Sequence, residues 1–137
     1  MNASIQPLNM SQQEWELRVK LAHCYHLVDY FGWTETIFNH ISARLPGDEN
    51  HYLVNPFGLN YSEVTPENLL KVDLAGNKVE PSEYDANPAG FALHSAVHGA
   101  RHDIRCLIHT HTTPISAVVQ KKNGFSYDSF YGAQLYG

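Results

Sequence analysis

The sequence has little cysteine, no long apolar run and no leader-like start. Its two cysteines, Cys24 and Cys106, lie in apolar periodic segments, which favours buried free thiols over a disulfide. No run reaches the roughly 18 apolar residues that a membrane-spanning helix needs, so we expect no helix that spans a membrane. Residues 1–10 lack the basic start and apolar stretch of a signal peptide. We therefore expect a cytoplasmic protein.

Positive charge is also scarce. The net charge is −5, and no basic cluster exceeds the pair Lys121-Lys122, so we do not expect nucleic acid or an anionic membrane as a main partner. Histidine, in contrast, is abundant: nine in 137 residues, which favours metal or proton chemistry. The length fits one domain, which we expect over residues 11–137 after a flexible tail over residues 1–10.

Helical and strand-like segments alternate along the chain. Ser11 and Glu14 form a capping box that begins a helix ending at Gly32, and Asn87-Pro88 begins a second helix through about Arg101. The other expected elements are a helix from Thr113-Pro114 to Lys121-Lys122, a short helix after Thr65-Pro66-Glu67, and strands over 37–45, 51–54, 70–74, 78–80 and 104–111, with hairpin turns at 46–50 and 75–77. This order predicts an α+β fold, a layered αβα domain with a largely antiparallel sheet.

His109-Thr110-His111 is the most informative motif. It ends the apolar run of residues 104–108 and precedes Pro114, a pattern that predicts a buried strand. Residues i and i+2 of a strand share a face and lie about 6.5–7 Å apart. Two imidazoles at that spacing can bind one metal ion at about 2.0–2.1 Å each. The alternative is a pair of histidines that cap a core strand and hydrogen-bond to nearby backbone.

Three further groups of residues are candidates for a site. His94 and His98 share one face of the second long helix, but no glutamate base lies between them, so they are expected to line the site rather than to ligate. The loop 55–58 has backbone amides that could hold an anion, or it is an ordinary turn. Polar residues over 39–44 begin a strand that could face the same pocket. No nucleophile-elbow or reactive-cysteine motif occurs.

The chain contains, in order, the segments Asn39-His40-Ile41-Ser42-Ala43-Arg44, Val54-Asn55-Pro56-Phe57-Gly58, Tyr61-Ser62-Glu63-Val64-Thr65, Lys71-Val72-Asp73-Leu74, Ala89-Gly90-Phe91-Ala92-Leu93-His94-Ser95-Ala96-Val97-His98 and Cys106-Leu107-Ile108-His109-Thr110-His111-Thr112. Together these segments resemble the class II aldolase/adducin head domain, most closely its adducin-like branch. The resemblance extends from about Glu14 to the end of the chain. It implies a three-layer αβα fold with a central, mainly antiparallel sheet, and a homo-oligomer, often a tetramer, with the site near a subunit interface.

The resemblance also implies a divalent metal, zinc in the aldolases of the family, with manganese as the alternative. Three histidines hold that ion, and two of them correspond to His109 and His111. The third lies downstream in the family, and no histidine follows His111 here, so we expect a chain that is truncated at its C-terminus. Substrate-binding positions of the family correspond loosely to Asn39, Phe57 and Gly58.

One position departs from the aldolases of the family. They carry a proton-transferring glutamate four residues before the position of His94, where this chain has Gly90. The usual sugar-phosphate cleavage is therefore not expected, although a metal can still polarise a carbonyl. Our first hypothesis is a protein that, when complete, is a metal-dependent lyase acting on a small carbonyl or sugar-derived substrate. The alternatives are a non-enzymatic adducin-like interaction domain that binds actin or the cytoskeleton, and an inactive truncated domain.

Overall fold

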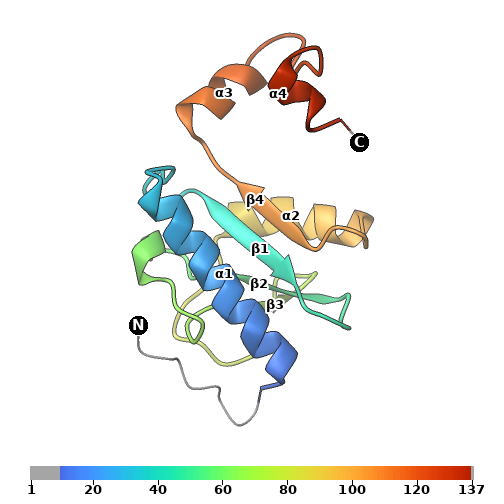
Figure 1. Ribbon diagram of the computed structural model, residues 1–137. Helices are drawn as coiled ribbons and strands as arrows, with labels where there is room; N and C mark the ends of the chain where they lie inside the picture. The colour runs from blue at the N-terminus through green and yellow to red at the C-terminus, as the bar shows by residue number, and fades with distance from the viewer. Residues whose placement is uncertain (1–9, 137) are drawn as a thin grey trace.

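The computed structural model describes residues 10–136, so the expected tail over residues 1–10 lies, except for Met10, outside the described residues. Helices, strands and loops alternate along the chain (Figure 1). The elements are α1 (Gln12–Tyr30), β1 (His40–Arg44), β2 (His51–Val54), the 3-10 helix η1 (Tyr61–Glu63), β3 (Leu70–Asp73), α2 (Pro88–Ala100), β4 (Cys106–His109), α3 (Thr113–Val119) and α4 (Phe130–Ala133).

The four strands form one antiparallel sheet in the order β3-β2-β1-β4. Helix α1 covers one face of this sheet and α2 lies against the other (Figure 1). The fold is therefore α+β with three layers, as the sequence predicts. Among the described residues, no helix is both long and apolar enough to cross a membrane.

The alternation of side chains along β1 explains why both faces of the sheet are covered. All five residues of this strand are buried. Ile41 and Ala43 belong to the apolar core that includes Leu21 and Tyr25 of α1. Because neighbouring residues of a strand point to opposite faces, the polar residues of β1 point toward α2. The strand thus presents an apolar face to one helix and a polar face to the other.

Helix α1 begins and ends where its sequence predicts. The Ser11 hydroxyl accepts a hydrogen bond from the Glu14 amide at 3.1 Å, and the helix is followed by Gly32, whose φ of 67° is easy only for glycine. The buried hydroxyl of Tyr25 donates to Asn55 Oδ1 at 2.9 Å. This contact fixes the loop after β2 against α1.

Strand β4 is shorter and more exposed than predicted. The expectation of a buried strand over 104–111 is wrong, since β4 covers Cys106–His109 and Ile108 is 61% exposed. The reason is its place at the end of the strand order, where one edge has no neighbouring strand among the described residues. Cys106 is exposed and Cys24 half-buried, so both are free thiols but neither is fully buried.

Two smaller elements also differ from the prediction. The return strand at 78–80 is reduced to a single bridge between Val72 and Lys78. No helix follows Thr65-Pro66; the helical turn lies earlier, in η1. At Thr65, the side chain of Asn68 accepts from the Thr65 amide at 2.8 Å and the Thr65 hydroxyl accepts from the Asn68 amide at 3.3 Å. These reciprocal bonds close a turn in place of a helix.

Candidate functional site

The strand register brings three predicted segments to one end of the sheet. His40 at the start of β1 pairs with His109 at the end of β4. Ser42 pairs with Val54, the last residue of β2, so the loop 55–58 begins beside the start of β1. These segments, which the sequence singles out separately, therefore share one edge of the fold.

His109 and His111 face each other at this edge. Their Nε2 atoms are 2.6 Å apart, and their ring centroids are separated by 4.6 Å. Partial burial, and then the neighbouring His111, lower the pKa of His109. At this distance the two nitrogens share a hydrogen bond, and a metal ion would bind the neutral form of each imidazole after the rings separate slightly. The pair thus brings two imidazole nitrogens to one point at the edge of the sheet.

Beside this pair, a buried chain of polar groups links β1 to α2. His40 Nδ1 lies 2.8 Å from His94 Nε2, and His94 Nδ1 lies 2.5 Å from the hydroxyl of Ser42. The same hydroxyl is 2.8 Å from His98 Nε2. The ring of His40 also stacks on His109, with centroids 4.6 Å apart and planes at 9°. The chain therefore starts beside the candidate metal ligands.

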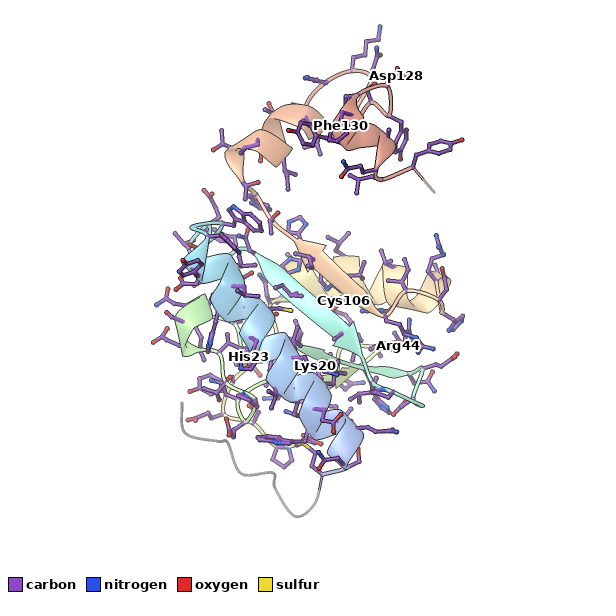
Figure 2. All side chains as sticks on the ribbon, viewed as in Figure 1. Lys20, His23, Arg44, Cys106, Asp128 and Phe130 are labelled. Carbon is purple, nitrogen blue, oxygen red and sulfur yellow. The ribbon has the colours of Figure 1, made fainter. Side chains whose placement is uncertain are left out.

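Arg44 closes the other end of the chain, at the far end of β1 (Figure 2). Its guanidinium donates to the carbonyl of His98, and its Nη2 lies 3.3 Å from His98 Nδ1. Its Nε donates to the carbonyl of Ile104 at 3.3 Å. These contacts satisfy a charge that is only 3% exposed.

The three histidines in this row of hydrogen-bonded groups are held neutral. Burial lowers the pKa of His40 to about 4, and the neighbouring His109 and His111 act in the same direction. Burial and His40 lower the pKa of His94 to about 3. Burial and Arg44 lower the pKa of His98 to about 4, against a smaller opposing effect of the Ile104 carbonyl. At neutral pH each ring therefore carries one proton, on one of its two nitrogens.

Gly90 packs against the ring of His40. A Cβ atom at position 90 would lie 2.7 Å from Cδ2 and 2.9 Å from Nε2 of His40, closer than atoms can approach. The space that a side chain at this position would need is thus filled by an imidazole. Gly90 is a steric requirement for the observed place of His40.

The predicted substrate positions lie at the same end of the sheet but do not bond to the histidines. Asn39 is buried; its Nδ2 donates to the Trp33 carbonyl at 2.7 Å, whereas its Oδ1 has no partner among the described residues. Phe57 is exposed and its amide donates to the Asp85 carbonyl at 2.8 Å. Gly58 has a φ of 94°, as a tight turn requires. Asn39 Oδ1 is thus a buried acceptor without a partner among the described residues.

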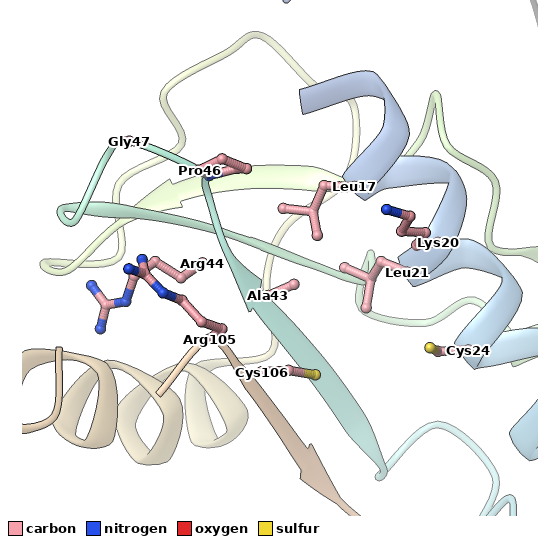
Figure 3. A pocket seen from close by; sticks show the side chains of 10 residues that line it. All are labelled: Leu17, Lys20, Leu21, Cys24, Ala43, Arg44, Pro46, Gly47, Arg105 and Cys106. Carbon is pink, nitrogen blue, oxygen red and sulfur yellow. The ribbon is translucent and has the colours of Figure 1, made fainter. Parts of the chain in front are cut away.

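Two hollows lie on the α1 side of the sheet, the first near the histidine pair and the second toward the other end of β1 and β4. One of about 570 Å³ is lined by Thr110, Thr112 and Trp33, and the other, of about 490 Å³, by residues including Cys24 and Cys106 (Figure 3). Ile108 also lines the first hollow, and because it neighbours His109 within β4, the hollow lies on the other face of that strand from His109. Among residues 10–136, no group of three or more His, Cys, Asp or Glu side chains is arranged to hold a metal.

Sequence reasoning identifies the parts of this site but not their connections. His94 and His98 are both buried and lie within hydrogen-bond distance of His40 and Ser42 of β1, and their expected role in lining the site stays a prediction. Ser42 and Arg44 stand out in the sequence only as polar residues at the start of a strand. The signal that could have assigned them is the alternation of His40, Ser42 and Arg44 on one strand face, opposite a helix face that carries two histidines.

The family model for the class II aldolase and adducin N-terminal domain matches residues 19–137. The chain therefore belongs to the class II aldolase and adducin family. A Pseudomonas aeruginosa protein named as an aldolase class 2 protein is 51% identical over 115 residues, which are 84% of this chain and 44% of the relative. Alpha-adducin of Mus musculus is 48% identical over 110 residues, 79% of this chain and 15% of that protein.

Solved structures agree in fold. A crystal structure of an aldolase II superfamily protein from Pseudomonas syringae has a TM-score of 0.84 and 46% identity, covering 90% of this chain and 50% of that one. L-fuculose 1-phosphate aldolase from Glaciozyma antarctica has a TM-score of 0.82 and 25% identity, covering 98% of this chain and 55% of that one. The chain thus spans about half the length of the bacterial relatives and structures that it matches.

Proposed function

We propose that this chain supplies the metal-binding edge of a lyase or related enzyme that acts on a small carbonyl or sugar-derived substrate. His109 and His111 hold a divalent cation, and zinc suits two imidazole ligands better than manganese does. The observation that carries the proposal is that the Nε2 atoms of both rings face the same point, 2.6 Å apart, so the rings need only separate slightly to hold one ion at about 2.0–2.1 Å each. The lowered pKa of His109 supports it, because a metal must compete with protons for the same nitrogen.

Bound zinc would act as a Lewis acid on a carbonyl or enolate oxygen of the substrate. The other residues of this edge bind and orient that substrate. Asn39 Oδ1, buried and without a partner among the described residues, accepts a hydrogen bond from a substrate hydroxyl, and Phe57 and Gly58 border the same end of the sheet. Gly90 carries no group for proton transfer, so α2 contributes no carboxylate at that position.

Zinc binding tests the proposal directly. Equilibrium dialysis of the chain against zinc should give stoichiometric binding, and the double variant His109→Ala/His111→Ala should lose it. His23→Ala is the matched control, because His23 is exposed on α1, away from β4 (Figure 2). Zinc bound equally by the double variant, or no zinc in a folded wild-type chain, would refute the metal site.

The family resemblance to adducin supports a second candidate, a non-enzymatic interaction domain in a homo-oligomer. The 48% identity to alpha-adducin and the glycine at position 90 favour it. Co-sedimentation with actin filaments separates the two candidates. Zinc binding without sedimentation supports the enzyme, and sedimentation that persists in His109→Ala/His111→Ala supports the interaction domain.

A further inference from the structure

The buried chain from Arg44 to His40 has a direction, which follows from the hydrogen-bonding chemistry of its members. A guanidinium donates hydrogen bonds and never accepts them. Since Arg44 Nη2 lies 3.3 Å from His98 Nδ1, this nitrogen accepts. The single proton of neutral His98 is then on Nε2, which donates to the hydroxyl of Ser42 at 2.8 Å.

Ser42 continues the hydrogen bonds in the same donor-to-acceptor direction. Its oxygen accepts from His98, so its one hydrogen points to His94 Nδ1 at 2.5 Å. His94 then carries its proton on Nε2 and donates to His40 Nδ1 at 2.8 Å. His40 in turn keeps its proton on Nε2. Each assignment follows from the one before, and the permanent charge of Arg44 sets the first.

Nε2 of His40 is the open end of this chain. No described residue accepts a hydrogen bond from it, and His40 as a whole is 5% exposed. The edge of the ring that carries Nε2 packs beside Gly90, and the face of the ring stacks on His109. A donor therefore stands next to the histidine pair with no described residue to receive its proton.

We propose that Arg44, His98, Ser42 and His94 act as positioning residues that hold His40 in its Nε2–H form, and that His40 donates this hydrogen bond to an oxygen of the substrate. The substrate role rests on the function proposed above, because the oxygen must belong to a molecule bound at His109 and His111. The direction of the chain does not rest on it. A fixed neutral donor stabilises negative charge that develops on an oxygen without giving up its proton.

The carbonyl of Ile104 defines the competing arrangement. If His98 gave an Nδ1 proton to that carbonyl, every bond of the chain would reverse and His40 Nε2 would be a bare acceptor. Arg44 opposes this reversal, because its Nε already donates to the same carbonyl at 3.3 Å and its Nη2 faces His98 Nδ1. The two arrangements predict opposite tautomers at three histidines.

Imidazole ¹⁵N NMR on the full, metal-free chain distinguishes them. We expect the Nε2–H tautomer at His40, His94 and His98. In Ser42→Ala, His98 should keep this tautomer, since Arg44 is intact, while His94 and His40 should become mixtures. Ser95→Ala is the matched control: Ser95 lies on the same helix and its hydroxyl donates to the Ala92 carbonyl, so its loss should change none of the three. A bare Nε2 at His40 in the wild type, or unchanged tautomers in Ser42→Ala, would overturn the proposal.

The substrate role has its own readout, with glycolate as the probe on the zinc-loaded chain. Ser42→Ala should leave zinc affinity unchanged and weaken glycolate binding about two- to tenfold, the effect of one neutral hydrogen bond. Equal glycolate affinity in wild type and Ser42→Ala would overturn the donor role. Failure of zinc to bind would overturn the proposed function instead. The tautomers measured on the metal-free protein would still decide the direction of the hydrogen bonds from Arg44 to His40.

Discussion

The ring of His40 fills the space that a side chain at position 90 would occupy. The packing of α2 on the sheet is therefore linked to the chemistry of the site. The polar face of β1 is buried under α2, and burial, with the neighbouring His109 and His111, keeps His40 neutral. A larger residue at position 90 would push the ring of His40 off His109 and away from His94. At the scale of single residues, the placement of His40 thus depends on the absence of a side chain at position 90.

Gly90→Ala should therefore destabilise the protein, by about 1–3 kcal/mol for an overpacked buried position. Gly99→Ala is the matched control, since Gly99 lies on the same helix and an added Cβ there would meet no atom within 4 Å. At that position the better helix propensity of alanine should add about 0.5–1 kcal/mol. Urea unfolding of both variants measures the difference. Equal stability changes of the same sign would contradict the packing of His40 against Gly90.

At the scale of elements, α2 depends on its N-terminal cap. The side chain of Asn87 accepts from the amides of Ala89 at 3.0 Å and Gly90 at 3.5 Å, which fixes the first turn above His40.

Such local signals explain which elements could be predicted. The caps and periodicity of α1 and α2 and the apolar run of β2 are written in adjacent residues, and the sequence predicts these elements to within a few positions.

Asn87→Ala should lower the free energy of unfolding by about 1 kcal/mol, the usual effect of losing an N-cap. Asn87→Asp keeps a capping oxygen and should remain close to the wild type. Thermal or urea denaturation of both variants provides the comparison. If Asn87→Asp lost as much stability as Asn87→Ala, the cap would not be the source of the effect.

Elements that depend on distant partners are predicted less well. The exposure of β4 follows from its place at the edge of the sheet, which no local pattern records. Within the site, too, contacts between residues far apart in the sequence are harder to predict than local ones. The facing of His109 and His111 is a two-residue spacing and could be predicted, whereas the bonds of Ser42 to His94 and His98 join residues 52 and 56 positions apart. Only the packing of α2 on β1 determines which residues meet there.

At the scale of the whole molecule, the buried neutral histidines make stability depend on pH. The pKa of His98 is about 4 in the folded state against 6.5 when exposed, so the unfolded chain takes up a proton first as the pH falls. Stability should be complete above pH 6.5 and decrease toward pH 4, by up to about 1.4 kcal/mol per pH unit for each such histidine.

Urea unfolding between pH 7.5 and pH 4.5, roughly spanning the window from the ordinary histidine pKa downward, measures this slope. His98→Gln should be less stable at neutral pH but have a shallower slope, because one buried titrating group is gone. His23→Gln, at an exposed position of α1, should keep the wild-type slope. An unchanged slope in His98→Gln would contradict the neutral, buried state of His98.

The central claim is that His109 and His111 bind one metal ion together. Anomalous diffraction at the zinc edge, from crystals grown with zinc, tests it most directly. The account predicts a single strong peak at about 2.0–2.1 Å from Nε2 of both histidines. No peak at this pair, or a peak bound to only one of its two rings, would contradict the account.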